Sequence, residues 1–501
     1  MSKTDNNDKN EWGSKISFLM AMIGSAVGLG NIWRYPYVLY SNGGGAFYIP
    51  YLTAILVMGI PFLLLEYGMG YHFKSSITKT FYNIKPKFEY IGWFIPVIVF
   101  LILIYYSCIV GWDGIYFILS FFKGWGANPN TFYTTTLLQS TNSISGLKYI
   151  IPVVAISVIV VWGIMWFISH RDLEKGLGKA SSILVPLLFL MMIIIVIFSL
   201  TLPGAMIGLK ALFDPNWSLL LNINIWLAAF GQVLFSLSLG MSIALTFASY
   251  LPNNEKLSDN VLWVVIANCG FENFAAFGVF SILGYMSLQS GVPLDQLVTQ
   301  GTGLIFIAYP TIFNILGTWS FILGPLFFLC VFFAGITSTL ALLEPISLSI
   351  QNKFALTRKK SMSILCLIGC LGTFIFSTGM GSYLLGIADT FLNQFGLLFG
   401  ILLECIIFGW VFGIEKLIPI FNNKSKFKIG KWWTVIIKFI LPLTIIFILV
   451  GGLGSIINNG KTMDITVEII ISAIFIITPL ILTIIPYKNR EFKRIPNHNK
   501  P

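Results

Sequence analysis

The chain has 501 residues, of which 56% are hydrophobic and only 10% carry a charge. A soluble globular chain contains about 25% charged residues, so this composition excludes a large water-soluble enzyme, and the apolar content also excludes intrinsic disorder. The apolar residues fall in blocks long enough to cross about 30 Å of hydrocarbon as helices, which predicts an all-α polytopic membrane protein.

The hydropathy pattern predicts about twelve transmembrane helices and no soluble domain. We expect them at residues 14–40, 45–72, 90–122, 149–169, 180–203, 222–250, 258–287, 319–351, 361–378, 386–413, 434–454 and 465–486. The first block is long and lacks a small-residue cleavage site, so it is predicted to be a retained span and not a signal peptide. The long connection at 288–318 could dip back as a lid over an outward opening or lie on the surface as a loop.

Charge is distributed unevenly among the loops. The chain carries 31 basic and 20 acidic residues, a net charge of +11, and the basic residues gather in alternate loops and at both ends. This asymmetry follows the positive-inside rule, so we expect both termini on the cytoplasmic side of the cell membrane. The lipid bilayer thereby accounts for the positive charge, and no nucleic-acid partner is expected.

Two of the predicted spans contain small residues where a helix could open. The first carries GSAVGLGN at 24–31 and the sixth carries FSLSLG at 235–240. Glycine costs about 1 kcal/mol relative to alanine inside a helix, and serine can offer the backbone another hydrogen bond. Broken helices at corresponding positions of two halves indicate a transporter binding site, while close helix packing is the alternative interpretation.

Nothing in the sequence predicts catalysis. The six cysteines lie in apolar segments without metal-ligand spacing, and the three histidines fall in loops. The chain has no motif for a nucleophile with its base or for a nucleotide. We therefore expect a protein that is not an enzyme and that binds no transition metal.

Five segments resemble the signature segments of the neurotransmitter:sodium symporter family, in its prokaryotic branch. They are GSAVGLGNIWRYP at 24–36, NGGGAFYIP at 42–50, GIPFLLLEYGMG at 59–70, GQVLFSLSLG at 231–240 and FFAGITS at 332–338. The resemblance implies sodium-coupled symport of an amino acid by alternating access, in a monomer or a homodimer. It also implies two inverted five-helix repeats, at 1–203 and 204–413, followed by two further spans at 414–501.

The resemblance implies two sodium sites built from carbonyl, hydroxyl and amide oxygens, the ligands that hard cations prefer. The first would be formed by Ala26, Asn31, Ser236, Asn268 and the carboxylate of the substrate. The second would be formed by Gly24, Val27, Ala334, Thr337 and Ser338.

The resemblance also implies the substrate site. The carboxylate would bind the Gly30 amide and the Tyr106 hydroxyl, and the ammonium would bind carbonyls of Ala26, Phe235 and Ser236 with the Ser238 region. Relatives that carry monoamines have an aspartate at the place of Gly28, so its absence here favours an α-amino acid. The substrate side chain would face Ile102, Tyr106, Phe235, Met241, Ser338 and Leu342. Flexible Met241 favours a bulky hydrophobic or aromatic substrate, or it simply fills the core.

The resemblance also implies which residues balance the charge of the site and which close its two ends. Glu272 stands where chloride-dependent members have a hydroxyl, which implies that no chloride is needed. Arg34 and Asp389 resemble the outer gate pair. Lys9, Trp12, Ser249 and Tyr250 resemble the inner lock, but the usual arginine is Lys9 and the expected aspartate is Asn352.

Two other functions are compatible with parts of this pattern. A sodium-dependent amino-acid sensor would need the same binding residues without turnover. An ion channel would be expected to show repeated pore segments or a ring of charges, and neither is visible in the sequence.

Overall fold

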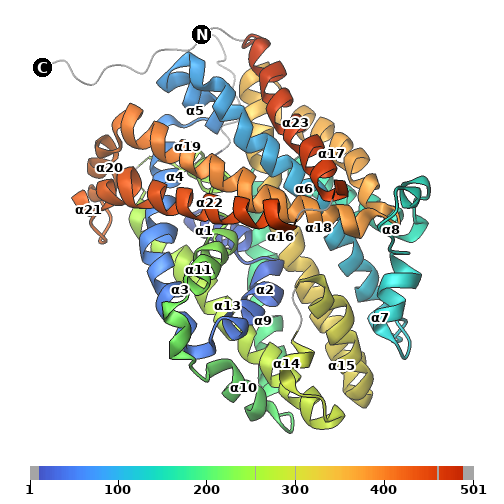
Figure 1. Ribbon diagram of the computed structural model, residues 1–501. Coiled ribbons are helices and arrows are strands. Elements are labelled where there is room, and N and C mark those ends of the chain that lie inside the picture. Colours follow the sequence, from blue (N-terminus) through green and yellow to red (C-terminus); the bar gives the residue numbers. More distant parts are fainter. Residues whose placement is uncertain (1–10, 254, 299–300, 460–461, 489–501) are drawn as a thin grey trace, which may run out of the picture.

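The computed structural model describes residues 11–253, 255–298, 301–459 and 462–488, and it is built from helices (Figure 1). Within these residues the only extended pairing is an isolated bridge between Ile150 and Thr378. The first half contains α1 (Lys15–Ala26), α2 (Leu29–Ser41), α3 (Tyr48–Ala54), α4 (Ile60–Phe73), α5 (Ile77–Ile84), α6 (Glu89–Ser120), α7 (Pro129–Thr131), α8 (Pro152–Ser169) and α9 (Lys179–Leu200).

The second half continues the helical architecture. It contains α10 (Ala205–Phe213), α11 (Ile223–Ser236), α12 (Ile243–Ser249), α13 (Leu257–Ser290), α14 (Leu294–Leu297), α15 (Tyr309–Ile315), α16 (Ser320–Phe354), α17 (Arg358–Thr373), α18 (Gly381–Phe391) and α19 (Leu398–Ile406). The last part contains α20 (Ile418–Asn422), α21 (Lys431–Val435), α22 (Leu441–Asn459) and α23 (Thr462–Ile484). In Figure 1, α5 lies at one end of the bundle and α10, α14 and α15 lie at the other.

Within the described residues, ten helices are long and apolar enough to cross a membrane, and the bent pair α1 and α2 makes an eleventh span. The prediction of a polytopic all-α membrane protein is therefore confirmed. The predicted sixth span does not reach the length of a continuous transmembrane helix, because α11 and α12 are separate pieces of 14 and 7 residues.

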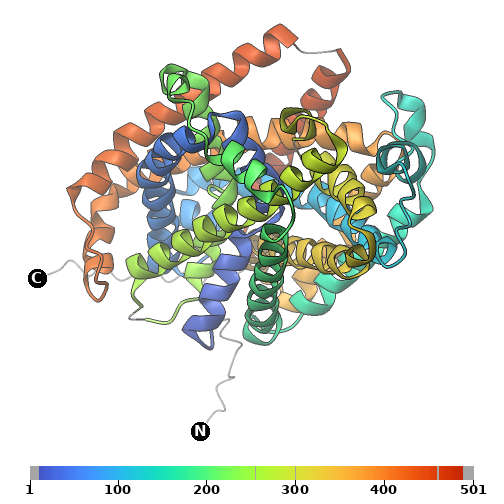
Figure 2. The same cartoon turned by 90° about the horizontal axis from the view of Figure 1, so that it is seen from below.

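The core is centred on α6 and α16, which pack against each other. Their most apolar stretches are 83% and 78% buried, against 22% and 11% for the spans Lys431–Gly451 and Asp464–Ile484. Figure 2 shows the last two helices, in red and orange, at the edge of the bundle. The central pair therefore forms the scaffold, and the last two spans present apolar surface that suits contact with lipid.

Both predicted helix breaks are present. α1 and α2 meet at an angle of 49°, with Val27 and Gly28 between them. The chain between α11 and α12 takes positive φ at Ser238 (51°), Gly240 (71°) and Ser242 (50°). Left-handed backbone of this kind cannot continue a right-handed helix, so it fixes the second break.

The long connection at 288–318 is largely helical and packed. Leu304, Ile305 and Phe306 are buried, and the Phe306 ring stacks on Tyr133, which lies between α6 and α8, with 5.4 Å between centroids. Tyr309 stacks on Phe327 of α16 at 3.8 Å. The segment therefore covers one end of the bundle as a packed structure.

Candidate functional site

The two helix breaks lie against each other and against α16. The Ser238 hydroxyl, from the break after α11, donates to the Ser25 carbonyl of α1 at 3.0 Å. The Ser338 hydroxyl of α16 donates to the Gly24 carbonyl at 3.4 Å. The carbonyl groups of Gly24 and Ser25, which would accept hydrogen bonds within an unbroken helix, thus accept them from neighbouring elements.

Three oxygen atoms converge beside the first break. The Asn268 side-chain oxygen lies 3.1 Å from the Ser236 carbonyl oxygen and 3.2 Å from the Ala26 carbonyl oxygen in the assigned orientation of its amide. The Asn31 amide nitrogen lies 2.8 Å from the same oxygen. Swapping the Asn268 amide would satisfy the two carbonyls but would place its nitrogen against that of Asn31. A cluster of buried oxygens that no single amide orientation satisfies fits a monovalent cation.

The residues predicted for a second ion lie where α1 meets α16. The Thr337 hydroxyl donates to the Ala334 carbonyl at 3.1 Å, and Ser338 reaches Gly24 as described above. A Cβ added at Gly24 would lie 3.2 Å from the Thr337 Cβ, so the two helices are in close contact here. Val27, the remaining predicted ligand, ends α1 with its N–H donating to the Ile23 carbonyl at 2.7 Å.

The start of α2 lies so close to neighbouring side chains that only glycine fits at Gly28 and Gly30 without a shift of those side chains. A Cβ at Gly28 would lie 2.8 Å from the Ser338 hydroxyl and 3.3 Å from the Tyr106 hydroxyl. A Cβ at Gly30 would lie 2.2 Å from the Phe235 ring. The Leu29 N–H points at the Tyr106 hydroxyl at 3.3 Å. We call the start of α2 at residues 28–30, with the Tyr106 and Ser338 hydroxyls, the cradle. Backbone N–H groups at a helix start attract anions, so the cradle suits a carboxylate.

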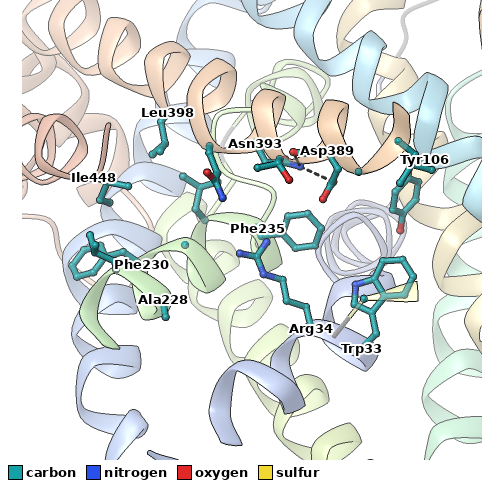
Figure 3. A pocket seen from close by; sticks show the side chains of 18 of the residues that line it. Trp33, Arg34, Tyr106, Ala228, Phe230, Phe235, Asp389, Asn393, Leu398 and Ile448 are labelled. Atoms are coloured by element: carbon teal, nitrogen blue, oxygen red, sulfur yellow. Dashed lines mark hydrogen bonds between the residues drawn. The ribbon is translucent and has the colours of Figure 1, made fainter. Parts of the chain in front are cut away.

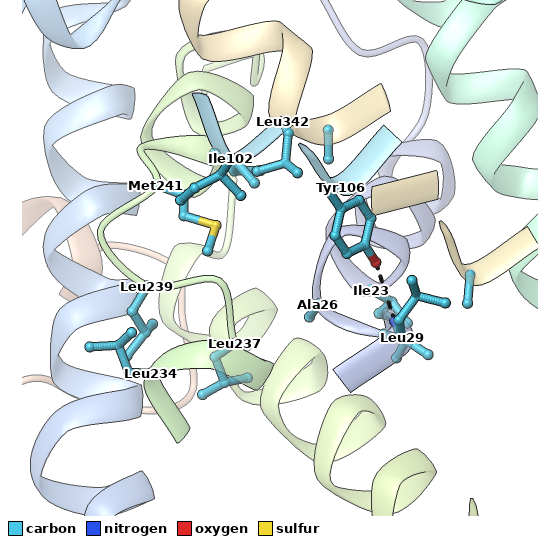
Figure 4. Packing of buried hydrophobic residues seen from close by; sticks show 14 of the residues in the cluster. Ile23, Ala26, Leu29, Ile102, Tyr106, Leu234, Leu237, Leu239, Met241 and Leu342 are labelled. Carbon is cyan, nitrogen blue, oxygen red and sulfur yellow. Dashed lines mark hydrogen bonds between the residues drawn. The ribbon is translucent and has the colours of Figure 1, made fainter. Parts of the chain in front are cut away.

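An apolar wall lies beside this cradle. Ile102 of α6, Met241 of the second break and Leu342 of α16 lie close together in Figure 4, with Tyr106 across from them. All four are buried, with 4–8% of their surface exposed. Three separate elements thus supply the wall, and the thioether of Met241 is its most adaptable member.

Glu272 is fully buried on α13 and is the acceptor for three donors. The Tyr51 hydroxyl binds one carboxylate oxygen, and the Gln232 amide binds the other at 3.1 Å. The Asn31 amide also reaches that oxygen at 3.4 Å. The Glu272 carboxyl group therefore lies next to the oxygen cluster and is joined to it through Asn31.

A cavity of about 710 Å³ lies between α2, α11 and α18 (Figure 3). Its exposed lining residues, Gly386, Thr390 and Gln394, show that it opens to the surface. The Arg34 guanidinium lies over the Phe235 ring, 4.9 Å from its centroid. Across the cavity, Asp389 accepts hydrogen bonds from the Tyr105 hydroxyl at 2.7 Å and is bound by Asn393 as well.

Arg34 and Asp389 therefore line the same cavity without forming an ion pair in this structure. Tyr105 and Asn393 hold the carboxylate instead, and sequence reasoning did not identify either residue. Asn393 lies one helical turn after Asp389, and this spacing is the signal that could have revealed it.

The opposite end of the site is closed. The Trp12 indole donates to the Phe247 carbonyl at 2.9 Å, and its backbone N–H donates to the Tyr250 carbonyl at 3.1 Å. Ser249 turns inward and donates to the Thr246 carbonyl at 2.6 Å. Lys9 lies outside the described residues.

A buried ion pair that the sequence analysis missed lies next to this closure. Arg358 forms a two-pronged contact with Glu344, and the Tyr250 hydroxyl lies 3.4 Å from the same carboxylate. Asn352 instead accepts a hydrogen bond from the Ser76 N–H at 3.0 Å. Paired guanidinium and carboxylate groups are strong when desolvated, so Glu344 and Arg358 provide an ionic contact at this end of the molecule.

Comparison with known proteins agrees with this geometry. The profile described as the sodium:neurotransmitter symporter family matches residues 9–142 and 125–464. An uncharacterized sodium-dependent transporter of Methanocaldococcus jannaschii is 36% identical over 97% of this chain and 99% of its own length. The sodium-dependent serotonin transporter of Drosophila melanogaster is 28% identical, covering 88% of this chain and 76% of its own. The sodium-dependent dopamine transporter of Caenorhabditis elegans is 25% identical, covering 89% and 80%.

Proposed function

The chain belongs to the sodium:neurotransmitter symporter family, and we propose that the solute it carries with sodium is an α-amino acid with a bulky hydrophobic or aromatic side chain. It is a multi-pass membrane protein whose family couples solute movement to sodium. The proposal further places it in the cell membrane with both termini in the cytoplasm, because the basic loops lie on that side.

The observation that carries the proposal is the uncharged cradle at Gly28. The three atoms nearest to a Cβ added there belong to Ser338 and Tyr106, and none of them is from an acidic side chain. An amine without a carboxylate would leave the start of α2 without an anion and would lack a counter-charge for its own ammonium. An α-amino acid brings both charges, so it fits this cradle better than a monoamine.

The apolar wall supports a large substrate side chain. Ile102, Met241 and Leu342 come from three elements and offer contacts to aliphatic or aromatic groups. The wall contributes affinity through buried apolar area, at about 25 cal/mol per Å². Leucine, isoleucine, phenylalanine, tyrosine and tryptophan are the candidates.

We propose two sodium ions as co-substrates. The substrate carboxylate would complete the first site with Ala26, Asn31, Ser236 and Asn268, so ion and amino acid raise each other's affinity by the same factor. The second ion would join α1 to α16. Two ions moving down a tenfold gradient and a 100 mV potential supply roughly 7 kcal/mol, enough to concentrate a zwitterion about 10⁵-fold.

The test is a binding screen of the twenty amino acids on the purified protein, with sodium and with choline in its place. We expect the hydrophobic or aromatic acids to raise the unfolding temperature only in sodium. Stabilisation by monoamines and not by amino acids would contradict the proposed substrate. Equal stabilisation in choline would contradict sodium coupling.

Transport is tested separately in liposomes. Sodium-dependent, electrogenic uptake and saturable counterflow are expected, and replacement of chloride by gluconate should leave the rate unchanged. Binding without counterflow would instead indicate a sensor, and unsaturable flux would indicate a channel.

A further inference from the structure

The turn that joins α8 to α9 forms a shallow basic cavity of about 470 Å³ on the surface. It is lined by His170, Arg171, Asp172, Lys175 and Lys179, and we call it the basic turn. We propose that the basic turn binds the phosphate headgroup of an anionic lipid, and that the bound lipid stabilises the closed inner end of the transporter. The proposal rests on the cytoplasmic placement of this end given above.

The charge of the basic turn is only partly compensated. Lys175 lies 3.6 Å from Asp172, and this is the one ion pair that the described residues make with its three cations. Arg171 and Lys179 are exposed and lack such a carboxylate among the described residues. A phosphate group would complement them, and each Lys or Arg near an anionic surface strengthens lipid binding.

Aromatic residues place the basic turn at the depth of lipid headgroups. Trp166 and Phe167, in the last turn of the α8 span, are exposed. The His170 ring stacks on Trp166 with 4.7 Å between centroids, and the Arg171 guanidinium lies 4.2 Å from the centre of the Phe167 ring. Exposed Trp at the end of a span marks the membrane interface, so the cationic groups lie where phosphates lie.

The basic turn is connected to the inner closure in two ways. The Arg358 guanidinium, which binds Glu344, also donates to the carbonyls of Arg171 at 2.8 Å and Ser169 at 3.1 Å. The Glu174 carboxylate accepts hydrogen bonds from the Gly13 N–H at 2.9 Å and the Ser17 hydroxyl at 2.6 Å. Fixing the turn therefore fixes both the ion pair and the segment that carries Trp12.

Lipid binding is tested on the full chain without substrate or sodium. Native mass spectrometry would be used to titrate phosphatidylglycerol and phosphatidylcholine onto wild type and the triple variant R171A/K175A/K179A. We expect phosphatidylglycerol to bind wild type preferentially and the variant to bind it about 100-fold more weakly. The matched control K424A/K426A/K428A removes three charges from another exposed basic loop and should bind like wild type.

A second variant separates a loss of lipid binding from a loss of folding. R171Q/K179Q keeps the Lys175–Asp172 pair and should lose most of the lipid affinity while unfolding at the wild-type temperature. An equal loss of phosphatidylglycerol affinity in K424A/K426A/K428A would show that positive charge anywhere on this face attracts the lipid, and it would overturn the proposal. So would displacement of the lipid by millimolar inorganic phosphate, which would indicate a soluble anion as the ligand.

The effect of the lipid on conformation is measured at the closed inner end, as the reactivity of a cysteine introduced at position 249. In nanodiscs and in a background without the native cysteines, Ser249→Cys should react with maleimide faster when phosphatidylglycerol is omitted. The same protein carrying R171A/K175A/K179A should react fast with or without this lipid. Unchanged reactivity would overturn the link to the closure. A failure of sodium-coupled uptake by wild type would contradict the proposed function and leave the lipid-binding result standing.

Discussion

At the scale of single residues, the proposed charge balance of the binding region depends on Gly28 and Glu272. A Cβ added at Gly28 would lie 2.8 Å from the Ser338 hydroxyl, and Glu272 places a carboxyl group within hydrogen-bond distance of Asn31. Gly28 could be singled out because it lies in a signature segment, and Glu272 because it stands where chloride-dependent members of the family have a hydroxyl. The Glu344–Arg358 contact could not, because its partners come from two helices whose crossing only the fold determines.

Replacing Gly28 by alanine should weaken substrate binding at least about tenfold, because the added Cβ would lie 2.8 Å from the Ser338 hydroxyl. A tenfold loss of affinity corresponds to about 1.4 kcal/mol of binding free energy. Equilibrium binding of the preferred amino acid would measure the change. Gly163→Ala is the matched control, since nothing lies within 4 Å of its added Cβ. Equal affinities of the two variants would refute the role of the cradle.

Replacing Glu272 by serine should make transport depend on chloride. The donors of Tyr51, Gln232 and Asn31 would lose their shared acceptor, and a small anion would replace it. Uptake by the variant in chloride and in gluconate checks this. Glu404→Ser removes an equally buried carboxylate that has no donor among the described residues, so it should not create a chloride requirement.

At the scale of elements, the break between α11 and α12 is maintained by backbone geometry. Ser238, Gly240 and Ser242 have positive φ, which only glycine adopts without strain. The sequence predicted where the break lies from its small residues. It could not predict that the two pieces would be so short, because their lengths depend on how α4 and α16 pack against α12.

Gly240→Ala should therefore destabilise the protein. A left-handed conformation costs an alanine roughly 1–2 kcal/mol, and its Cβ would lie 2.2 Å from a side-chain carbon of Ile401. The unfolding temperature in detergent should fall relative to wild type. Gly270→Ala, within α13 and with nothing near its Cβ, should unfold at the wild-type temperature or above it. A Gly240→Ala protein as stable as wild type would contradict the argument.

At the scale of the whole molecule, one end of the site is open and the other is closed. The cavity beside Arg34 reaches the surface, while Trp12 and Tyr250 cover the opposite end. The gating roles that the family resemblance implies stay predictions, as does the division into repeats at 1–203 and 204–413. Which gate is closed could not be predicted, since the same sequence must adopt both arrangements during transport.

Glu344→Gln should shift the molecule towards opening at its closed end. Removing one partner of a buried ion pair leaves an uncompensated charge, at a cost of about 3–5 kcal/mol, and Arg358 is only 8% exposed. In a background without the native cysteines, a cysteine at Ser249 should react faster with maleimide. Glu415→Gln breaks an exposed pair with Lys438 and should change the rate little. Similar maleimide reaction rates in both variants would contradict the role of the Glu344–Arg358 pair in keeping this end closed.

The open cavity also makes the protein sensitive to compounds from one side of the membrane. A polar molecule that cannot cross the bilayer can reach the Phe235 ring through the opening lined by Gly386 and Thr390, but not past Trp12 from the other face. In the orientation proposed above, an inhibitor that keeps Arg34 and Asp389 apart would act without entering the cell. Its potency would report, in intact cells, how much of the population faces outward.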